Sequence, residues 1–400
     1  MRTSDELTVR PLEHADAEAS RRLGFEAFGM PTTPPAEPAS LELPGRTFHG
    51  VFSGQRLIAR LADRAYDSWF GGVPVPTSGI AGVTVAMEDR GRGALSPLFA
   101  AALAAARERG AAVSGLFPSA ARIYRSFGYE LVGDYRTVRV ATSELATVPA
   151  PARVATRRAV VDDLPAVRDL YDRWAAAQNG ALTRRGTSFP HSDTELLEDF
   201  DGITVAEDTD GRLVGYASWD RGQHYDDRGT LEVSDLLASS ADGYRALLQA
   251  LGSFSAVTPT TKIDTSGDDV ARLFLPGRRW ETVASDPYMI AVIDVPAALG
   301  RRGYPWFLSA RLGFRVAGDR VAGIDGAYRL EVAEGVAGCV AEEHDDDRTF
   351  APRGLALLYA GVQSCANLRW AGLLSGGRLE QDAVWDTLFG GRQFHIRDYY

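Results

Sequence analysis

Cysteine, histidine and lysine are scarce in this sequence of 400 residues. The first two shortages argue against disulfide bonds and metal sites. The two cysteines, Cys339 and Cys365, form no Cys-x-x-Cys pair, so both are expected to be reduced packing residues. The six histidines are scattered without metal-ligand spacing, so no metal is expected. Lys262 is the one lysine among 43 basic residues, which indicates a GC-rich genome rather than a mechanism.

Long apolar runs are also absent. No uncharged run reaches the roughly 18 apolar residues that a membrane span requires, and the opening MRTSDELTVRP has no apolar core of signal-peptide length. We therefore expect a cytoplasmic protein with no membrane partner. The net charge of −10 argues against nucleic acid as a partner, because phosphate backbones need a basic surface, and it suits a cationic small-molecule substrate.

The length and composition are those of a folded protein with more than one domain. Hydrophobic residues make up 45% and charged residues 24% of the chain, which is ordinary for globular proteins. A chain of 400 residues exceeds what one hydrophobic core supports, so two or three domains are expected.

One stretch, residues 78–95 (SGIAGVTVAMEDRGRGAL), combines three features of an anion-binding site. Ile80, Val83 and Val85 indicate a buried strand. An Arg-Gly-Arg-Gly turn follows at residues 90–93, just before an Ala/Leu-rich helix. Glycines let backbone N–H groups close on an oxygen-rich ligand, and a helix N-terminus favours negative charge. The pattern predicts a turn that holds the pyrophosphate of a coenzyme.

Around this stretch the sequence predicts a mixed α/β layer. The expected elements are a strand at 7–12, a helix at 14–28, a Pro-rich loop or broken helix at 30–46, a hairpin of 47–52 and 55–63, a helix at 93–109, a strand at 113–117, a helix at 119–127 and a strand from 129. Gly110 and Gly128 are expected to end the two later helices.

The same pattern returns after a Pro/Ala linker at residues 146–152. A strand at 230–239 is again followed by a helix, at 244–251. The corner between them has no arginine, and Asp242 within it would repel a phosphate. Residues 153–292 are therefore predicted to be a second copy of the scaffold that has lost the coenzyme turn.

The remaining residues, 293–400, predict a third unit of mixed helices and strands. Helices are expected at 355–361, 367–371 and 381–389, strands at 313–316, 327–332 and 336–342, and helical or mixed segments at 294–299 and 306–312. Trp370 and Trp385 are expected in its core. The closing residues, RQFHIRDYY, suggest a buried terminus.

Several motifs together resemble a known superfamily. VTVAMEDRGRGAL at 83–95 and PSAARIYRSFGYELVG at 118–133 resemble the GNAT N-acetyltransferases. IDGAYRLEV, GLALLYAGVQSCANLRWAGLL and the closing WDTLF resemble a sterol-carrier-like domain. The whole layout resembles the Eis-type (enhanced intracellular survival) branch. This resemblance implies an N-terminal catalytic GNAT domain at 1–145, a degenerate GNAT-like domain at 153–292 and a sterol-carrier-like α+β domain at 293–400, assembled as trimers or paired trimers.

The resemblance also assigns roles to residues. Tyr124 matches the family's catalytic tyrosine, which protonates the departing thiolate of coenzyme A. Tyr400 stands where the family often has phenylalanine and would offer its terminal carboxylate as the acceptor of the amine's proton. The residues implied in binding acetyl-CoA are Val83, Thr84, Val85, Arg90, Gly91, Arg92, Gly93, Ala94, Leu95, Ser96, Ser119 and Ala120.

General chemistry agrees with these roles. Attack on a thioester needs a neutral amine, whereas free alkylamines are mostly protonated at pH 7. A carboxylate takes the ammonium proton if burial raises its pKa or if water relays the proton, and a phenol can protonate a leaving thiolate. Both tyrosines also have plainer interpretations, Tyr124 as core packing and Tyr400 as a frayed end.

Four further residues are candidates for contact with the acceptor. Glu26, flanked by Phe25 and Phe28, lines an amine pocket in one interpretation and faces solvent on its helix in the other. Asp398 has the same two interpretations.

The sequence thus predicts an acetyl-CoA-dependent N-acetyltransferase. Direct transfer in a ternary complex is expected, because no Cys, Ser or His near the turn resembles an activated nucleophile. The family and the acidic balance favour a polycationic acceptor such as an aminoglycoside or a polyamine. The alternatives are a protein lysine or N-terminal amine as acceptor, or a hydrophobic-ligand carrier whose acetyltransferase part is vestigial.

Overall fold

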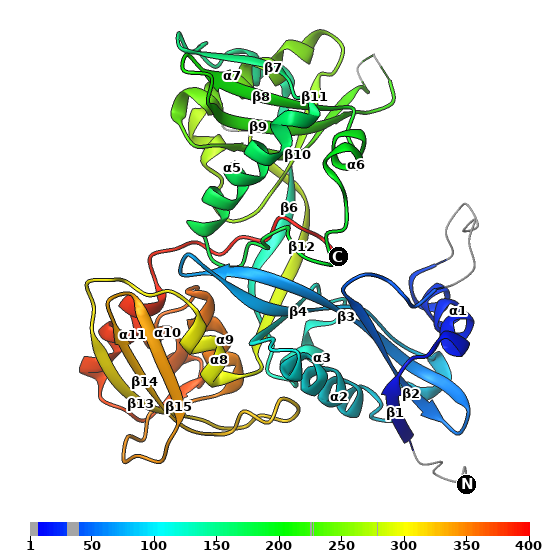
Figure 1. Cartoon of the computed structure of the whole chain (residues 1–400), viewed down its shortest axis with the longest axis vertical. Helices are drawn as coiled ribbons and strands as arrows, with labels where there is room; N and C mark the ends of the chain where they lie inside the picture. Colours follow the sequence, from blue (N-terminus) through cyan, green and yellow to red (C-terminus); the bar gives the residue numbers. More distant parts are fainter. Residues whose placement is uncertain (1–6, 30–39, 225, 227, 278) are drawn as a thin grey trace.

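The computed structural model describes residues 7–29, 40–224, 226, 228–277 and 279–400, so most of the predicted loop at 30–46 lies outside the described residues. Figure 1 shows three lobes, with strand β1 (Leu7–Pro11) to β6 (Glu130–Ala141) at the lower right, α4 (Thr142–Ala146) to η5 (Val270–Phe274) at the top and α8 (Val295–Arg301) to α11 (Asp382–Phe389) at the lower left. No helix in the described part of the chain is long and apolar enough to cross a bilayer.

The first lobe has the predicted order of elements. They are β1 (Leu7–Pro11), η1 (His14–Asp16), α1 (Ala17–Phe28), β2 (Arg46–Ser53), β3 (Arg56–Phe70), β4 (Val73–Val85), η2 (Met87–Asp89), α2 (Leu95–Glu108), β5 (Val113–Leu116), α3 (Ala121–Arg125) and β6 (Glu130–Ala141). Helix α2 buries Leu98, Phe99 and Leu103 on the sheet because these residues share one side of the helix. Strands β3 and β6 are longer than predicted, and α3 is shorter.

The second lobe repeats the arrangement. Its elements are α4 (Thr142–Ala146), β7 (Val154–Arg158), η3 (Val161–Asp163), α5 (Leu164–Ala176), α6 (Asp193–Glu198), β8 (Gly202–Asp208), β9 (Leu213–Arg221), β10 (Thr230–Ala238), α7 (Ala241–Gly252), η4 (Ser253–Ala256), β11 (Thr260–Thr265) and η5 (Val270–Phe274). As β4 does with β5, strand β10 runs parallel to β11. The internal repeat predicted from sequence is thus present in the backbone.

The two copies share one sheet, which the sequence did not predict. Strand β12 (Glu281–Val292) follows the second lobe in sequence but lies between β5 and β6 of the first. Strand β6 also pairs with β11 of the second lobe. In the described residues these links give a continuous twelve-stranded sheet, in the order β1-β2-β3-β4-β5-β12-β6-β11-β10-β9-β8-β7.

The third lobe packs helices on a small sheet. Its elements are α8 (Val295–Arg301), β13 (Ala310–Val316), β14 (Gly326–Ala333), β15 (Val336–Ala341), β16 (Thr349–Phe350), α9 (Pro352–Ala360), α10 (Cys365–Trp370), β17 (Leu374–Ser375), η6 (Leu379–Gln381) and α11 (Asp382–Phe389). Both cysteines are buried and unpaired, as predicted.

The segment predicted as helical or mixed at 306–312 is a turn followed by the start of β13, and Trp306 and Phe307 are exposed in the turn. The prediction that both Trp370 and Trp385 lie in the core is wrong in part. Trp385 is fully buried, as predicted, but Trp370 is 85% exposed. Helix α10 has only six residues and buries Cys365 and Leu368, so Trp370 at its end faces outward.

The last residues leave the third lobe and return to the junction of the other two, as the red segment in Figure 1 shows. The His395 N–H donates to the Asn179 carbonyl at 2.8 Å. Arg397 forms an ion pair with Asp269 at 2.7 Å, and both side chains are almost fully buried. Ile396 is also fully buried. These contacts fix the path of the chain up to Tyr400.

Candidate active site

The Arg/Gly turn between β4 and α2 has a backbone that favours glycine. Gly91 and Gly93 both have φ of 79°, in the left-handed region. A Cβ atom at either position would meet nothing within 4 Å, so the backbone angle rather than lack of space demands glycine. The N-cap of α2 is Ala94, whose methyl group accepts no hydrogen bond. The first N–H groups of α2 therefore have no side-chain cap.

A buried carboxylate beneath this turn orders its arginines. Asp89 is 1% exposed and forms ion pairs with Arg56 at 2.7 Å and Arg92 at 2.6 Å. Burial would raise the pKa of Asp89, but hydrogen bonds from Arg92 and Arg56 lower it below the ordinary value. Asp89 thus holds Arg92 beside the turn, and both Arg90 and Arg92 are exposed to solvent. Sequence reasoning missed Asp89 and Arg56; the three-residue spacing from Asp89 to Arg92 was the available signal.

The equivalent corner of the second lobe is closed by its own side chains. The Ser240 hydroxyl caps α7 by accepting the Gly243 N–H at 3.0 Å. Asp242 forms an ion pair with Arg245 at 2.8 Å. The start of α7 is therefore capped by a side chain and carries a carboxylate, whereas the start of α2 has neither, which agrees with loss of the coenzyme turn in the second copy.

Strand β4 carries a bulge close to its end. Arg60 of β3 pairs with Thr84, but the next pair is Ala62 with Ala81, so the register shifts between them. Gly82 lies in the shifted part with φ of 58°. A bulge leaves backbone groups of the strand unpaired and bends it. Polar backbone groups are thereby available beside Val83, Thr84 and Val85.

A cavity of about 400 Å³ opens where β4 and β5 separate. The pairing of these strands ends at Gly79 and Gly115. We call it the β4–β5 cavity. Its lining residues are Phe28, Arg64, Ile80, Ala81, Gly82, Val83, Leu116, Phe117, Pro118, Ser119, Tyr124, Asp286, Pro287, Tyr399 and Tyr400. The fold thus brings Tyr124 and Tyr400 to one cavity, although they are far apart in sequence.

Tyr124 lies on α3 with its ring packed into the core. It is 5% exposed, and its ring centroid lies 5.8 Å from that of Phe99. Burial raises the pKa of the Tyr124 phenol above its ordinary value, and the Ser119 hydroxyl offsets part of that rise. The phenol is therefore protonated at neutral pH and can donate a proton.

Aromatic neighbours hold Tyr400 in place, and two glycines leave room for its ring. Its hydroxyl lies 2.8 Å from the Tyr288 hydroxyl, and its ring centroid lies 5.0 Å from that of Tyr66. A Cβ at Gly79 would come within 3.0 Å of the Tyr400 ring, and one at Gly115 within 1.9 Å of the Tyr288 hydroxyl. These two glycines, which are paired across β4 and β5, leave the space that the two tyrosines fill.

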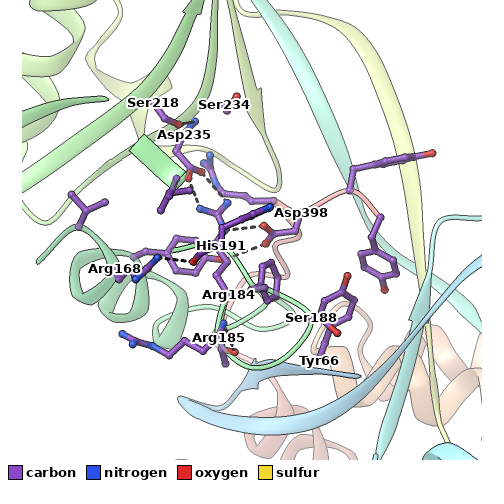
Figure 2. A pocket seen from close by; sticks show the side chains of 18 of the residues that line it. Tyr66, Arg168, Arg184, Arg185, Ser188, His191, Ser218, Ser234, Asp235 and Asp398 are labelled. Carbon is purple, nitrogen blue, oxygen red and sulfur yellow. Dashed lines mark hydrogen bonds and ion pairs between the residues drawn. The ribbon is translucent and has the colours of Figure 1, made fainter. Parts of the chain in front are cut away.

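A second cavity, of about 500 Å³, lies between the first two lobes and shares Arg64, Tyr399 and Tyr400 with the first. We call it the interdomain cavity. Figure 2 shows Arg184 between Asp235 and Asp398, with an ion pair to each. The charged and titratable side chains that line it are Arg46, Arg64, Arg168, Asp172, Arg184, Arg185, His191, Asp235, Arg397 and Asp398, together with six tyrosines.

Some of the remaining predicted site residues line the two cavities, and others do not. Asp398 lines the interdomain cavity, where burial raises its pKa although Arg184 opposes that rise. Phe28 lines the β4–β5 cavity. Phe25 lies in a separate hollow and stacks on Arg21. Glu26 is exposed and lines neither named cavity. Ser119 lines the β4–β5 cavity, and Ala120 follows it as the N-cap of α3.

Comparisons with known proteins match each part of the chain. Models of an acetyltransferase (GNAT) domain match residues 8–132 and 180–295, and a sterol carrier protein domain matches residues 295–397. An uncharacterized N-acetyltransferase of Streptomyces griseus is 28% identical over 412 residues, which covers 96% of both chains. N-acetyltransferase Eis of Mycobacterium tuberculosis (strain H37Ra) is 27% identical over 321 residues, covering 76% of this chain and 75% of that protein.

Solved structures share the architecture. A GCN5-related N-acetyltransferase from Kribbella flavida superposes with a TM-score of 0.84 at 28% identity and covers 100% of both chains. Eis1 from Mycobacterium abscessus has a TM-score of 0.76 at 24% identity and covers 99% of this chain and 100% of its own, which shows the same fold. The chain is thus an N-acetyltransferase with two GNAT domains and a sterol-carrier-like domain, and it resembles the Eis-type enzymes.

Proposed function

We propose that this enzyme transfers an acetyl group from acetyl-CoA directly to the amine of a small molecule, where the β4–β5 and interdomain cavities meet. The single observation that carries the proposal is that Tyr124, Tyr400 and the bulged end of β4 surround one cavity. Acetyl-CoA supplies the acetyl group as an activated thioester.

The residues fit a bound coenzyme. The backbone from Gly91 to Ser96, which leads into the uncapped start of α2, suits the pyrophosphate. Arg90, and Arg92 which shares the one carboxylate of Asp89 with Arg56, add positive charge beside it. The unpaired backbone at the bulge suits the amides of the pantetheine arm. The capped start of α7 in the second domain lacks these features, which supports one coenzyme site per chain.

The two tyrosines take part in two different proton transfers, one to the leaving group and one from the incoming amine. Tyr124 holds its proton at neutral pH and gives it to the leaving thiolate. The carboxylate of Tyr400 takes a proton from the incoming ammonium, directly or through water, so that a neutral amine attacks. Asp398 precedes Tyr400 by two residues and is held by Arg184, which orients the end of the chain.

The size of the interdomain cavity supports a small acceptor over a protein lysine. A volume of about 500 Å³ is in the range of sites that enclose a drug-sized molecule. Its charges do not support the polycationic acceptor expected from composition, because six arginines and three aspartates line it. We therefore assign an amine acceptor without a requirement for several positive charges.

The test is release of free thiol from acetyl-CoA in the presence of a panel of amines, with the acetylated products identified by mass. We expect amine-dependent release at equal stoichiometry with product and no acetylated enzyme when acetyl-CoA is added alone. Release that requires no amine, or a stable acetyl-enzyme, would contradict direct transfer.

A further inference from the structure

Two arginines stand side by side on the wall of the interdomain cavity. Arg46 of β2 and Arg64 of β3 are paired residues of adjacent antiparallel strands, so their side chains project on the same side of the sheet. Like charges directly opposite each other destabilise a sheet. The cost in stability suggests that the pair is kept for a function, such as binding an anion.

The other arginines of this cavity are neutralised by protein carboxylates. Arg184 is bound to Asp235 and Asp398, as Figure 2 shows. The remaining ion pairs are Arg168 with Asp193, Arg185 with Asp172 and Asp169, and Arg397 with Asp269.

Arg46 and Arg64 have no such partner. Within the part of the chain that the structure describes, neither lies within ion-pair distance of a carboxylate. The Arg64 Nε is buried and makes no hydrogen bond, while its Nη1 donates to the Tyr66 hydroxyl at 3.3 Å. Burial lowers the pKa of Arg46, and the charge of Arg64 lowers it further. Two unpaired guanidinium groups therefore face one space.

The position of Arg64 connects this pair to the reacting end of the site. Arg64 lines both cavities, and its guanidinium carbon lies 5.8 Å from the centroid of the Tyr400 ring. It is opposite Gly79 on β4, six residues before the end of the strand, so the pair lies about 20 Å from the Arg/Gly turn. The coenzyme pyrophosphate at that turn leaves the pair free.

We propose that Arg46 and Arg64 form a subsite for an anionic group, a carboxylate or a phosphate, carried by the same small molecule whose amine is acetylated. Planar guanidinium groups bind both anions through paired hydrogen bonds. The inference rests on the proposed function for the amine half of the ligand, whereas the anion half rests on the arginine pair alone. The acceptor class is thus an amine with an acidic group, and aromatic walls from Tyr66 and Phe189 suit an apolar spacer.

Matched acceptors test the proposal in the thiol-release assay. The pairs are phenethylamine with phenylalanine and ethanolamine with O-phosphoethanolamine, and spermidine represents the polycations. We expect the anionic member of at least one pair to have the higher kcat/KM. Arg64→Gln and Arg46→Gln should each lower that value about 10-fold or more, as expected for one charged hydrogen bond, and should lower it much less for the pair member that lacks the acidic group.

Arg185→Gln is the matched control. It removes one positive charge from the same cavity, but from an arginine already bound to Asp172. An equal loss in this variant would overturn the proposal in favour of a general field effect. A preference for spermidine that strengthens in Arg64→Gln would overturn it also.

Inorganic phosphate gives a readout that does not depend on acetyl transfer. Phosphate should raise the melting temperature of the wild-type enzyme more than that of Arg64→Gln, and equal shifts would remove the subsite. Without phosphate, Arg64→Gln should melt no lower than wild type, because a like-charge pair is relieved. If phosphate discriminates but no amine is acetylated, the anion subsite stands and the proposed function fails.

Discussion

Single residues define the proposed chemistry, and Tyr124 is the most direct to test. Tyr124→Phe keeps the ring against Phe99 but removes the proton donor. We expect kcat to fall about 100-fold, in the range typical of general acid catalysis, while acetyl-CoA binding stays within about twofold because no contact with the coenzyme phosphates is lost. Steady-state thiol release measures kcat, and isothermal titration calorimetry measures the affinity for acetyl-CoA.

Tyr129→Phe is the matched control for that variant. Tyr129 is a buried neighbour whose hydroxyl bonds to Ser114 at 2.6 Å, and it lines neither cavity. Its loss should lower stability by about 1 kcal/mol, as for a typical buried hydrogen bond, without a change in kcat. Equal activity in Tyr124→Phe and wild type would remove Tyr124 from the mechanism.

At the scale of elements, the start of α2 is the site proposed for the coenzyme. Gly93→Ala forces a residue with a side chain to adopt φ of 79° and displaces the adjacent N–H groups. We expect acetyl-CoA affinity to fall about tenfold, equivalent to about 1.4 kcal/mol. Gly54→Ala is the control, since Gly54 also has positive φ (59°) with nothing near its Cβ position, but lies in a hairpin turn. Equal affinity in the two variants would contradict the phosphate-binding role.

The terminal segment carries a pH-sensitive contact. His395 is buried against Ser266, and burial, assisted by the charge of Arg397, lowers its pKa to about 4. Because the folded pKa lies below the unfolded value of about 6.5, this group favours folding fully above pH 6.5, and the contribution is lost as pH falls toward 4. The loss amounts to about 3 kcal/mol over that window.

His395→Gln tests this linkage. Glutamine can still bond to Ser266 but does not titrate, so the melting temperature of the variant should fall less steeply than that of wild type between pH 6.5 and 4.5. Parallel curves for the two proteins would show that His395 does not contribute to acid sensitivity.

The whole molecule shows what sequence could and could not predict. Local patterns located nearly every element of the first domain and the Arg/Gly turn, because apolar periodicity and glycine placement act over a few residues. The insertion of β12 between β5 and β6 could not be predicted, since strand pairing at long sequence separation leaves no local signal. Trp370 was misplaced because residue type alone does not say which side of a short helix is covered.

The candidate site likewise has features that the sequence predicts and features that only the structure shows. Tyr124 and the turn were recognisable as motifs, and the position of Tyr124 in the β4–β5 cavity agrees with its proposed role. The opposition of Arg46 and Arg64, by contrast, depends on the register of β2 and β3. The glycine pair that seats Tyr400 and Tyr288 depends on the register of β4 and β5. Both features emerge only when the strands are aligned in three dimensions.

The central claim is that the terminal carboxylate of Tyr400 acts in the same cavity as Tyr124, and the length of the chain end tests it most directly. The sterol-carrier-like domain brings Tyr400 to the β4–β5 cavity, where we assign its carboxylate the role of base. One glycine added after Tyr400 moves that carboxylate by about 3.5 Å and leaves the coenzyme turn untouched. Amine-dependent thiol release by the extended enzyme should fall at least about 100-fold, with acetyl-CoA affinity unchanged. Full activity in the extended enzyme would contradict the account.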